Sequence, residues 1–192
     1  TELIKLGYKP GIVSRGYGGK FKETLKVTNE TPVKQTGDEA QILSTLNIPF
    51  YIDKNRVRAL KTLNDNHNCD VIISDDGLQH YNMNRDVEIV VIDGKRRFGN
   101  NLSFPAGPLR ESLKRLDSVD FIVNNSGPTE DGEHLMNVSP AKFIHLKSGK
   151  SYSVEDWPMH KQVHAVAGLG NPGRFFDLLA RLGFDITRNP FP

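Results

Sequence analysis

The sequence has one cysteine, no long apolar run and almost no net charge. Because Cys69 has no second cysteine to pair with, the chain cannot form an internal disulfide, which fits a reducing compartment. The apolar runs are only a few residues long, so this sequence contains no transmembrane helix and no signal peptide. A formal net charge of +2 gives no support for nucleic-acid binding. The composition is that of a soluble globular protein without a nucleic-acid partner.

Two ligand-binding patterns are missing as well. The Gly-x4-Gly-Lys-Ser/Thr phosphate loop does not occur, although the segment 15–20 is glycine-rich and follows a predicted strand. Phe21 stands where that motif would need Ser or Thr. We interpret the segment as a loop that lets Arg15 or Lys20 approach an anion, and the alternative is a flexible solvent loop. The histidines other than His80 show no metal-ligand spacing, so we do not expect a zinc site.

Both ends of the sequence look cut. It begins at Thr1 without an initiator methionine, and it ends at Pro192 just after a predicted strand at 184–187. We therefore expect an internal piece of a longer protein, in which a membrane-contacting helix could precede Thr1.

Apolar runs of strand length alternate with segments of helical spacing. Strands are predicted at 10–14, 50–52, 71–74, 88–92 and 120–123, and helices at 38–46, 56–66 and, more briefly, 111–116. This alternation predicts an α/β fold with a mostly parallel sheet and helices on both faces. Ligands of such folds bind beyond the carboxyl ends of the strands.

From about Gly127 the pattern of the sequence changes. A polar loop at 127–132 is followed by a hairpin at 141–154, and then by a strand at 163–167, a helix at 174–182 and the strand at 184–187. We therefore predict a core in 1–126, a linker and hairpin in 127–158, and the start of a smaller C-terminal α/β subdomain in 159–192.

Two adjacent carboxylates end the apolar run Val71–Ser74. A buried strand that ends in Asp75 and Asp76 delivers acid groups to a sheet edge, which is the usual place for Mg²⁺ in a phosphoryl-transfer enzyme. The alternative is that Asp-Asp-Gly only forms a turn. Gln79 and His80 follow closely and can hydrogen-bond a phosphate, which favours the metal interpretation.

A second pair of acids, Asp38 and Glu39, opens a predicted helix after Gly37. One interpretation is an N-cap aspartate with a first-turn glutamate that the helix dipole favours. The other is a carboxylate near a transferable phosphate, which accepts a hydroxyl proton or holds metal.

A basic, proline-containing segment follows the predicted strand 88–92. Lys95, Arg96 and Arg97 lie at the carboxyl end of this strand, where guanidinium groups could hold a phosphate, although such cations usually belong to a solvated loop. The Pro-Ala-Gly-Pro run at 105–108 would stiffen the long loop, and a stiff long loop is typical of functional sites.

Taken in order along nearly the whole chain, these motifs resemble those of the tetraacyldisaccharide 4'-kinase family. The matching segments are Val13-Ser14-Arg15-Gly16-Tyr17-Gly18-Gly19, Gly37-Asp38-Glu39, Asp75-Asp76-Gly77-Leu78-Gln79-His80, Arg85-Asp86, Asp93-Gly94, Arg97-Phe98-Gly99-Asn100, Pro105-Ala106-Gly107-Pro108-Leu109-Arg110-Glu111 and Gly168-x-Gly-x-Pro-x-Arg-Phe-Phe. The resemblance implies a P-loop NTPase-like kinase that uses ATP and Mg²⁺. Its substrate would be an acylated glucosamine disaccharide 1-phosphate, and its product lipid IVA of the lipid A pathway. Its place would be the cytoplasmic face of the Gram-negative inner membrane, as a peripheral protein.

The resemblance also implies roles for single residues. Asp75 and Asp76 match acids that act on Mg²⁺, with Glu39 supporting the metal. Asp38 matches the carboxylate that takes the 4'-hydroxyl proton, and Asp76 and His80 belong to the catalytic group. The expected contacts to phosphates or to the disaccharide are Arg15, Gln79, Arg97, Asn100 and Arg110.

Three family features do not occur in this sequence. The family's P-loop and its membrane-contacting N-terminal helix lie ahead of the region that matches Thr1, and a C-terminal histidine that pairs with the catalytic carboxylate is also missing. We therefore expect membrane contact mainly through the missing helix, and no useful kinase activity from these 192 residues alone. The alternatives are another P-loop small-molecule kinase and a non-catalytic anion-binding relative.

Overall fold

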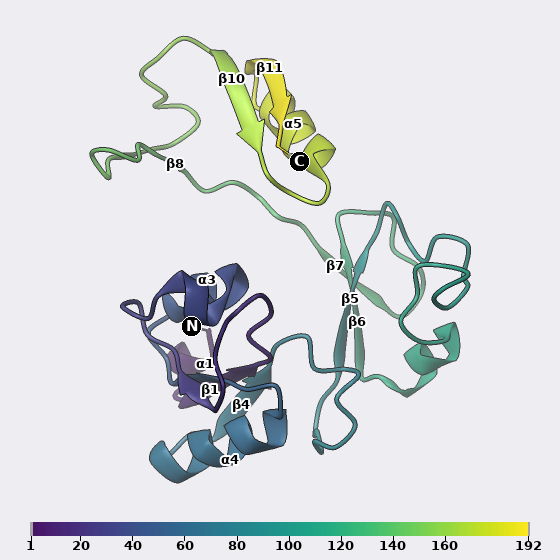
Figure 1. Cartoon of the computed structure of the whole chain (residues 1–192). Helices are drawn as coiled ribbons and strands as arrows, with labels where there is room; N and C mark the ends of the chain where they lie inside the picture. Colours follow the sequence, from purple (N-terminus) through teal and green to yellow (C-terminus); the bar gives the residue numbers. More distant parts are fainter. Residues whose placement is uncertain (1, 192) are drawn as a thin grey trace. The chain divides into compact units, whose positions relative to one another are not determined.

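The computed structural model describes residues 2–191, which divide into two compact units, the first ending at Met136 and the second beginning at Asn137 (Figure 1). The first unit contains two sheets and the candidate site residues. The second unit contains a short hairpin and a small α/β arrangement.

The first sheet has four strands in the order β2-β3-β1-β4. β1 (Pro10–Ser14) lies in the middle and pairs in parallel with β3 (Phe50–Ile52) and with β4 (Val71–Ser74). The short β2 (Leu25–Lys26) is antiparallel to β3. Because the three main strands run in one direction, Ser14, Ile52 and Ser74 end at the same edge of the sheet.

Two helices cover opposite faces of this sheet (Figure 1). Side chains alternate between the faces of a strand, so neighbouring residues of β1 enter different cores. Ile12 packs with Phe50 and with Ala40 of α3 (Asp38–Ser44). Val13 packs with Leu63 of α4 (Arg56–Asn66) on the other face. The predicted α/β fold with helices on both faces is confirmed.

The second sheet of the first unit is entirely parallel. It consists of β5 (Ile89–Asp93), β6 (Phe121–Asn125) and β7 (Glu133–Met136) in that order. A 3₁₀-helix, η1 (Leu113–Ser118), precedes β6. The remaining short helices of this unit are α1 (Glu2–Lys5) and α2 (Val33–Thr36).

The second unit is built around two parallel strands joined by a helix. β10 (Gln162–Ala167) pairs with β11 (Asp185–Pro190), and α5 (Pro172–Arg181) connects them. The hairpin of β8 (Phe143–Ile144) and β9 (Ser151–Tyr152) precedes this arrangement. The rings of Phe143, Trp157 and Phe184 pack edge to face with centroids 4.9–5.4 Å apart. The hairpin therefore shares the hydrophobic core of this unit.

The structure adds elements that the sequence pattern does not reveal. β7 contains Glu133-His134-Leu135-Met136, which has no apolar run, and it is held by pairing with β6. This pairing places 127–136 with the first unit, so the division between the units comes after Met136. The helix predicted at 111–116 is the 3₁₀-helix of 113–118. Within residues 2–191, no helix combines the length and the apolar character that crossing a bilayer requires.

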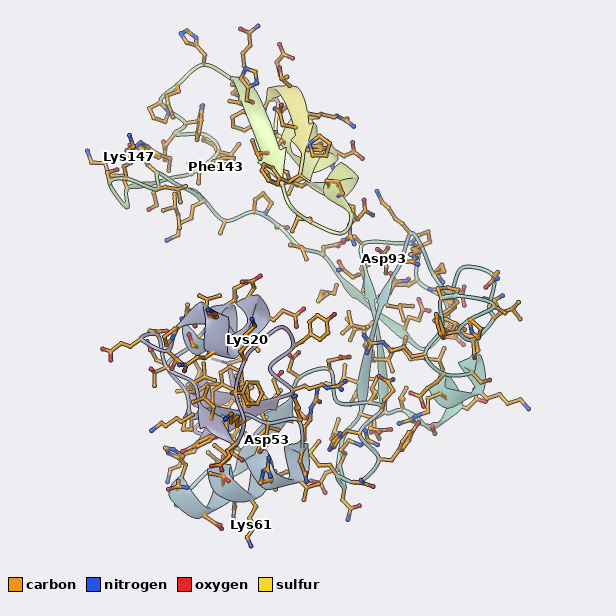
Figure 2. The ribbon with its side chains drawn as sticks, viewed as in Figure 1. Lys20, Asp53, Lys61, Asp93, Phe143 and Lys147 are labelled. Carbon is orange, nitrogen blue, oxygen red and sulfur yellow. The ribbon has the colours of Figure 1, made fainter. Side chains whose placement is uncertain are left out.

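A buried carboxylate, Asp53, fixes the carboxyl end of β3 (Figure 2). Its side chain is 1% exposed and forms an ion pair with Arg58 at 2.6 Å. It also accepts hydrogen bonds from the Thr24 hydroxyl and from the Asn55 N–H. Burial raises the pKa of the Asp53 carboxyl, but the bonds from Arg58, Thr24 and Asn55 outweigh it and hold the pKa below its usual range. Asp53 therefore stabilises the fold above the pKa of an unfolded aspartate, and this contribution disappears as the pH falls through the lowered pKa.

We expect Asp53→Asn to reduce the free energy of unfolding at pH 7 by about 1–3 kcal/mol, because the Asp53–Arg58 pair is lost while Arg58 stays half exposed. The difference from the unchanged protein should begin to shrink below about pH 4, where the aspartate of the unfolded chain becomes protonated, and should disappear as the pH falls through the lowered pKa of the folded carboxyl. Urea unfolding at both pH values measures this. Asp65→Asn, at an exposed position of α4, is the matched control. An equal loss of stability at both pH values would contradict the assignment.

Candidate functional site

The first pair of candidate acids lies at the carboxyl edge of the first sheet. Asp75 directly follows β4 and keeps the strand pairing, because its N–H donates to the Val13 carbonyl at 3.0 Å. Its carboxylate accepts a hydrogen bond from the Ser14 hydroxyl at 3.3 Å. Asp76 has a left-handed backbone, φ 46°, and turns the chain away from the strand direction. Asp75 therefore continues the strand, whereas Asp76 lies in the turn that follows it.

A chain of polar contacts joins Asp76 to the segment after the proline-rich loop. Arg110 donates to Asp76 at 2.8 Å and to the Gln79 side-chain oxygen at 3.2 Å. Gln79 in turn donates to Glu111 at 2.7 Å, and the Tyr81 hydroxyl donates to the other oxygen of Glu111. Asp76 and Arg110 are both more than half exposed, so this ion pair is weak and a ligand can displace it.

A less exposed ion-pair group holds the backbone that follows the acids. Arg115 contacts both oxygens of Glu88 at 2.6 Å, and Arg85 lies 2.9 Å from the same carboxylate. Arg85 also donates to the carbonyls of Gly77 and Leu78 at 3.0 and 2.8 Å. This group fixes the course of the loop between Asp76 and β5.

A cleft of about 850 Å³ opens beside the acid pair, in the first unit. Its walls come from α4, β4, the loop after β4, and β5. The polar side chains at its surface include Asp75, Asp76, Arg85 and Glu88, and its apolar walls include Leu60, Ile72, Met83 and Val91. An apolar cleft with a few convergent charged groups is typical of a small-molecule site.

Arg56 lies behind the acid pair as the first residue of α4. It is 3% exposed, and its guanidinium donates to the Ser74 hydroxyl at 3.0 Å. Burial lowers the pKa of Arg56, and Arg15 lowers it further, whereas Asp76 and Asp75 oppose the change. The sequence analysis missed this residue, although it follows the carboxyl end of β3 closely and opens a predicted helix.

His80 lies in a positively charged environment. Burial lowers the pKa of its imidazole, and the charges of Arg56, Arg85 and Arg15 lower it further, so the ring is neutral at pH 7. Its Nε2 atom is buried and has no hydrogen-bond partner among residues 2–191. A neutral imidazole can donate or accept one hydrogen bond there, but it does not supply a charge.

The second pair of acids, Asp38 and Glu39, is free of partners in the described part of the chain. The N-cap of α3 is Gly37 and has no side-chain capping bond, so the capping interpretation of Asp38 is wrong. Both carboxylates lie exposed in the first turn of α3, and no hydrogen bond or ion pair within residues 2–191 engages either of them. The arrangement leaves both available to a ligand.

The glycine-rich loop lies against the start of α3. A Cβ atom at Gly37 would lie 2.0 Å from the Tyr17 carbonyl oxygen, and one at Gly19 would lie 2.3 Å from that of Gln35. The Lys20 N–H also donates to the Lys34 carbonyl at 3.0 Å. This close approach needs glycine at both positions, and it brings the loop that carries Arg15 next to the segment that carries Asp38.

Two other predicted ligand contacts already have partners in the chain. Arg97 contacts both oxygens of Glu133 at 2.7 and 2.9 Å, and it lies 2.7 Å from Glu130. Asn100 donates to the Ala106 carbonyl at 2.9 Å and so supports the proline-rich loop. A ligand at Arg97 would have to compete with two carboxylates.

The structure therefore brings together one part of the predicted site. Arg110 contacts both Asp76 and Gln79, and Arg15 and His80 share the electrostatic environment of Arg56. Within residues 2–191, no three His, Cys, Asp or Glu side chains lie close enough to hold a metal ion by themselves. Mg²⁺ commonly takes only one or two carboxylates and completes its shell with phosphate oxygens and water, which Asp75 and Asp76 suit.

Comparisons with known proteins agree along the whole chain. A family model described as tetraacyldisaccharide-1-P 4'-kinase matches residues 1–192. The tetraacyldisaccharide 4'-kinases of Methylobacillus flagellatus and Shewanella frigidimarina are 45% and 44% identical over 100% and 97% of this chain, and over 58% and 56% of their own lengths. The chain thus spans a little over half the length of these curated relatives.

A solved structure agrees with the fold. The crystal structure of LpxK from Aquifex aeolicus in complex with ATP has a TM-score of 0.78 and 26% sequence identity. The similarity covers 100% of this chain and 64% of that one.

Proposed function

Since this chain belongs to the tetraacyldisaccharide 4'-kinase family, we propose that the protein carrying it transfers the γ-phosphate of ATP to the 4'-hydroxyl of tetraacyldisaccharide 1-phosphate. The product is lipid IVA, an intermediate of lipid A biosynthesis. One observation carries the proposal beyond the resemblance: the two carboxylates at the carboxyl end of β4 lie among arginines. Acids for a metal and cations for phosphate in one place are what phosphoryl transfer requires.

Asp75 and Asp76 are the proposed ligands of Mg²⁺, with Glu39 as a further supporting carboxylate. When bound, Mg²⁺ neutralises charge on the transferring phosphate. Asp75 is held by the Ser14 hydroxyl, and Asp76 by Arg110. Arg110 is then free to contact a phosphate when Asp76 turns to the metal.

Asp38 is the proposed acceptor of the 4'-hydroxyl proton. Its carboxylate is exposed, and no side chain or backbone group of residues 2–191 occupies it. The close approach of Gly37 to Tyr17 fixes the adjacent backbone, so the Asp38 side chain extends from a fixed position. A base held in position contributes about 10²–10⁴-fold to the rate of proton transfer.

The remaining polar residues have proposed roles in binding and orientation. Arg15 and Gln79 contact phosphate or sugar oxygens, and the neutral His80 supplies a hydrogen bond beside the acids. Asn100 shapes the loop that ends at Arg110. Arg97 contacts the substrate only if Glu133 releases it.

The acylated substrate sets the proposed location of the protein. A tetraacylated disaccharide resides in a membrane, so the kinase works at its surface, as a peripheral protein on the cytoplasmic face of the inner membrane.

The test uses the full-length gene product with labelled ATP and tetraacyldisaccharide 1-phosphate in detergent micelles. We expect phosphorylation of this acceptor and none of deacylated disaccharide or simple sugars. Asp38→Asn should lower kcat by about 10²–10⁴-fold with little change in the KM for ATP. Glu30→Gln, an exposed acid outside the site, is the control.

Other outcomes would support the alternatives. Equal phosphorylation of simple sugars would indicate a different small-molecule kinase. Phosphate binding without any transfer would indicate a non-catalytic relative.

A further inference from the structure

Glu133 is the centre of a buried polar cluster in the second sheet. It is the first residue of β7, and its side chain is 5% exposed. Its carboxylate accepts hydrogen bonds from Arg97 at 2.7 and 2.9 Å and from the fully buried Asn124 at 2.7 Å. The Glu130 N–H donates to the same carboxylate at 3.0 Å. The chain itself therefore occupies the oxygens of Glu133, and this residue does not contact a ligand.

Arg97 connects the long loop after β5 to this cluster. The loop leaves the sheet after Asp93, which Figure 2 labels at the end of β5, and the Arg97 N–H donates to the Asp93 carbonyl at 2.7 Å. Arg97 has a left-handed backbone, φ 51°, which is unfavourable for a residue with a Cβ atom. Such a conformation persists where the surroundings determine it, and here the guanidinium contacts both Glu133 and Glu130 at 2.7 Å. The side chain of Arg97 therefore fixes the point at which the loop begins.

Internal contacts connect the two ends of this loop. A Cβ atom at Gly99 would lie 2.8 Å from a side-chain carbon of Pro108, so these two residues pack closely. The Asn100 side chain donates to the Ala106 carbonyl at 2.9 Å. Both contacts join the start of the loop to the residues just before Arg110. A shift at the start of the loop therefore also displaces its end.

The loop ends at the acid edge of the first sheet. Arg110 contacts Asp76 at 2.8 Å and Gln79 at 3.2 Å, but Arg110 and Asp76 are both more than half exposed. An exposed ion pair is weak, so this contact does not by itself hold Arg110 in one place. In the pair at the start of the loop, Arg97 and Glu133 are only 24% and 5% exposed. Of the two ion pairs, the one at the start of the loop therefore fixes it more firmly.

We propose that Glu133 is a positioning residue for phosphoryl transfer. Through Arg97 it holds the loop 97–110, and the loop places Arg110 beside Asp76. The part of Arg110 in the reaction rests on the proposed function, whereas the connection from Glu133 to the loop rests on the contacts alone. Arg97 is then an anchor of the loop and not a contact to phosphate.

The test uses Glu133→Gln in the full-length gene product. Glutamine has the size of glutamate, but one oxygen is replaced by an amide group that donates. This group would face Arg97, Asn124 or the Glu130 N–H, which are donors as well, so the hold on Arg97 is weakened. We expect kcat/KM for transfer to tetraacyldisaccharide 1-phosphate to fall by about 10-fold, because a small misplacement of a positioned group slows the reaction. Asp131→Asn, at an exposed position of the preceding loop, is the control and should leave kcat/KM unchanged.

A double-variant cycle shows whether Glu133 acts through Arg110. If it does, Glu133→Gln should change kcat/KM by less than about twofold in a protein that already carries Arg110→Gln. A merely structural role would instead give the double variant the full product of the two single losses. Hydrogen exchange of the peptides that cover 97–110, measured without substrate, should be faster in Glu133→Gln than in the unchanged protein or in Asp131→Asn.

Three results would overturn the proposal. They are independent effects of Glu133→Gln and Arg110→Gln, unchanged hydrogen exchange in 97–110, and tighter binding of ATP or of the acceptor by Glu133→Gln. The last result would mean that Arg97, once released, contacts the substrate directly. If Glu133→Gln does not fold, Arg97→Gln takes its place, because it leaves the other hydrogen bonds of Glu133 intact. The same cycle with Arg110→Gln and the same exchange measurement then decide.

The positioning role and the proposed function can fail separately. If the unchanged protein phosphorylates no acylated disaccharide but exchange in 97–110 is faster in Glu133→Gln, the anchoring of the loop stands and the proposed function fails. If the unchanged protein and Glu133→Gln phosphorylate the acylated disaccharide with equal kcat/KM, the positioning role fails and the proposed function stands.

Discussion

Replacing Asp75 with asparagine is expected to lower kcat/KM for phosphoryl transfer by about 10³-fold, which corresponds to about 4 kcal/mol of transition-state stabilisation. Asparagine preserves the size of the side chain and its acceptor for the Ser14 hydroxyl, so the edge of the sheet should remain intact. What disappears is the negative charge that would hold Mg²⁺ against the phosphates. The loss should therefore concern catalysis and not folding.

Asp76→Asn is expected to have an effect of similar size for the same reason, but with an additional signature. Its carboxylate is also the partner of Arg110, so the double variant with Arg110→Gln should lose less than the sum of the single effects. Steady-state kinetics over a range of Mg²⁺ concentrations, with circular dichroism of each variant, measures both effects. Asp117→Asn, at an exposed position of η1, serves as the control. A loss below about tenfold at either acid would contradict their assignment to the metal.

Gly37→Ala is expected to destabilise the first unit by more than about 3 kcal/mol. A Cβ atom at this position would lie 2.0 Å from the Tyr17 carbonyl oxygen, and a backbone atom cannot move aside as the end of a side chain can. The residue also has φ 82°, which costs a residue with a Cβ atom about 1–2 kcal/mol. The loop that carries Arg15 would have to separate from the start of α3, and Asp38 would lose its fixed position.

Gly18→Ala separates these two causes. Gly18 lies in the glycine-rich loop that carries Arg15. It has φ 77°, but a Cβ atom there meets nothing within 4 Å. We therefore expect only the backbone cost of about 1–2 kcal/mol at Gly18 and a clearly larger loss at Gly37. Urea unfolding gives both values, and kinase assays of the folded fraction show whether Asp38 is displaced. If the two substitutions lower the free energy of unfolding equally, the close approach of Gly37 to the Tyr17 carbonyl does not contribute to the stability of the first unit.

The strands and helices that the sequence predicts well are those whose pattern is local. The apolar residues of β1 and β3 form uninterrupted runs, and α4 begins and ends where its helical spacing does. β7 could not be predicted, because Glu133 and His134 carry no strand pattern and the strand exists through pairing with β6. Secondary structure that depends on a distant partner leaves little trace in its own residues.

The candidate site shows the same division. Asp75 and Asp76 were predictable, since they end an apolar strand and strand ends are visible in the sequence. The capping interpretation of Asp38 was wrong because Gly37, with its positive φ, occupies the cap position. The partners of Arg97 were not predictable, because Glu133 reaches it only through the order of strands in the second sheet. The burial of Arg56 likewise results from how α4 packs on the sheet.

The contact between Arg110 and Asp76 has a consequence for how the proline-rich loop behaves in solution. An exposed ion pair contributes about 0–1 kcal/mol, and thermal energy is about 0.6 kcal/mol, so the joined state outnumbers the separated state by a factor of about five at most. The loop is itself stiff, since the Phe104 N–H donates to the Leu109 carbonyl and Asn100 supports Ala106. Arg110 and the tip of the loop should then move together as one rigid segment. This segment contacts Asp76 for part of the time, and little free energy is needed to separate it from Asp76.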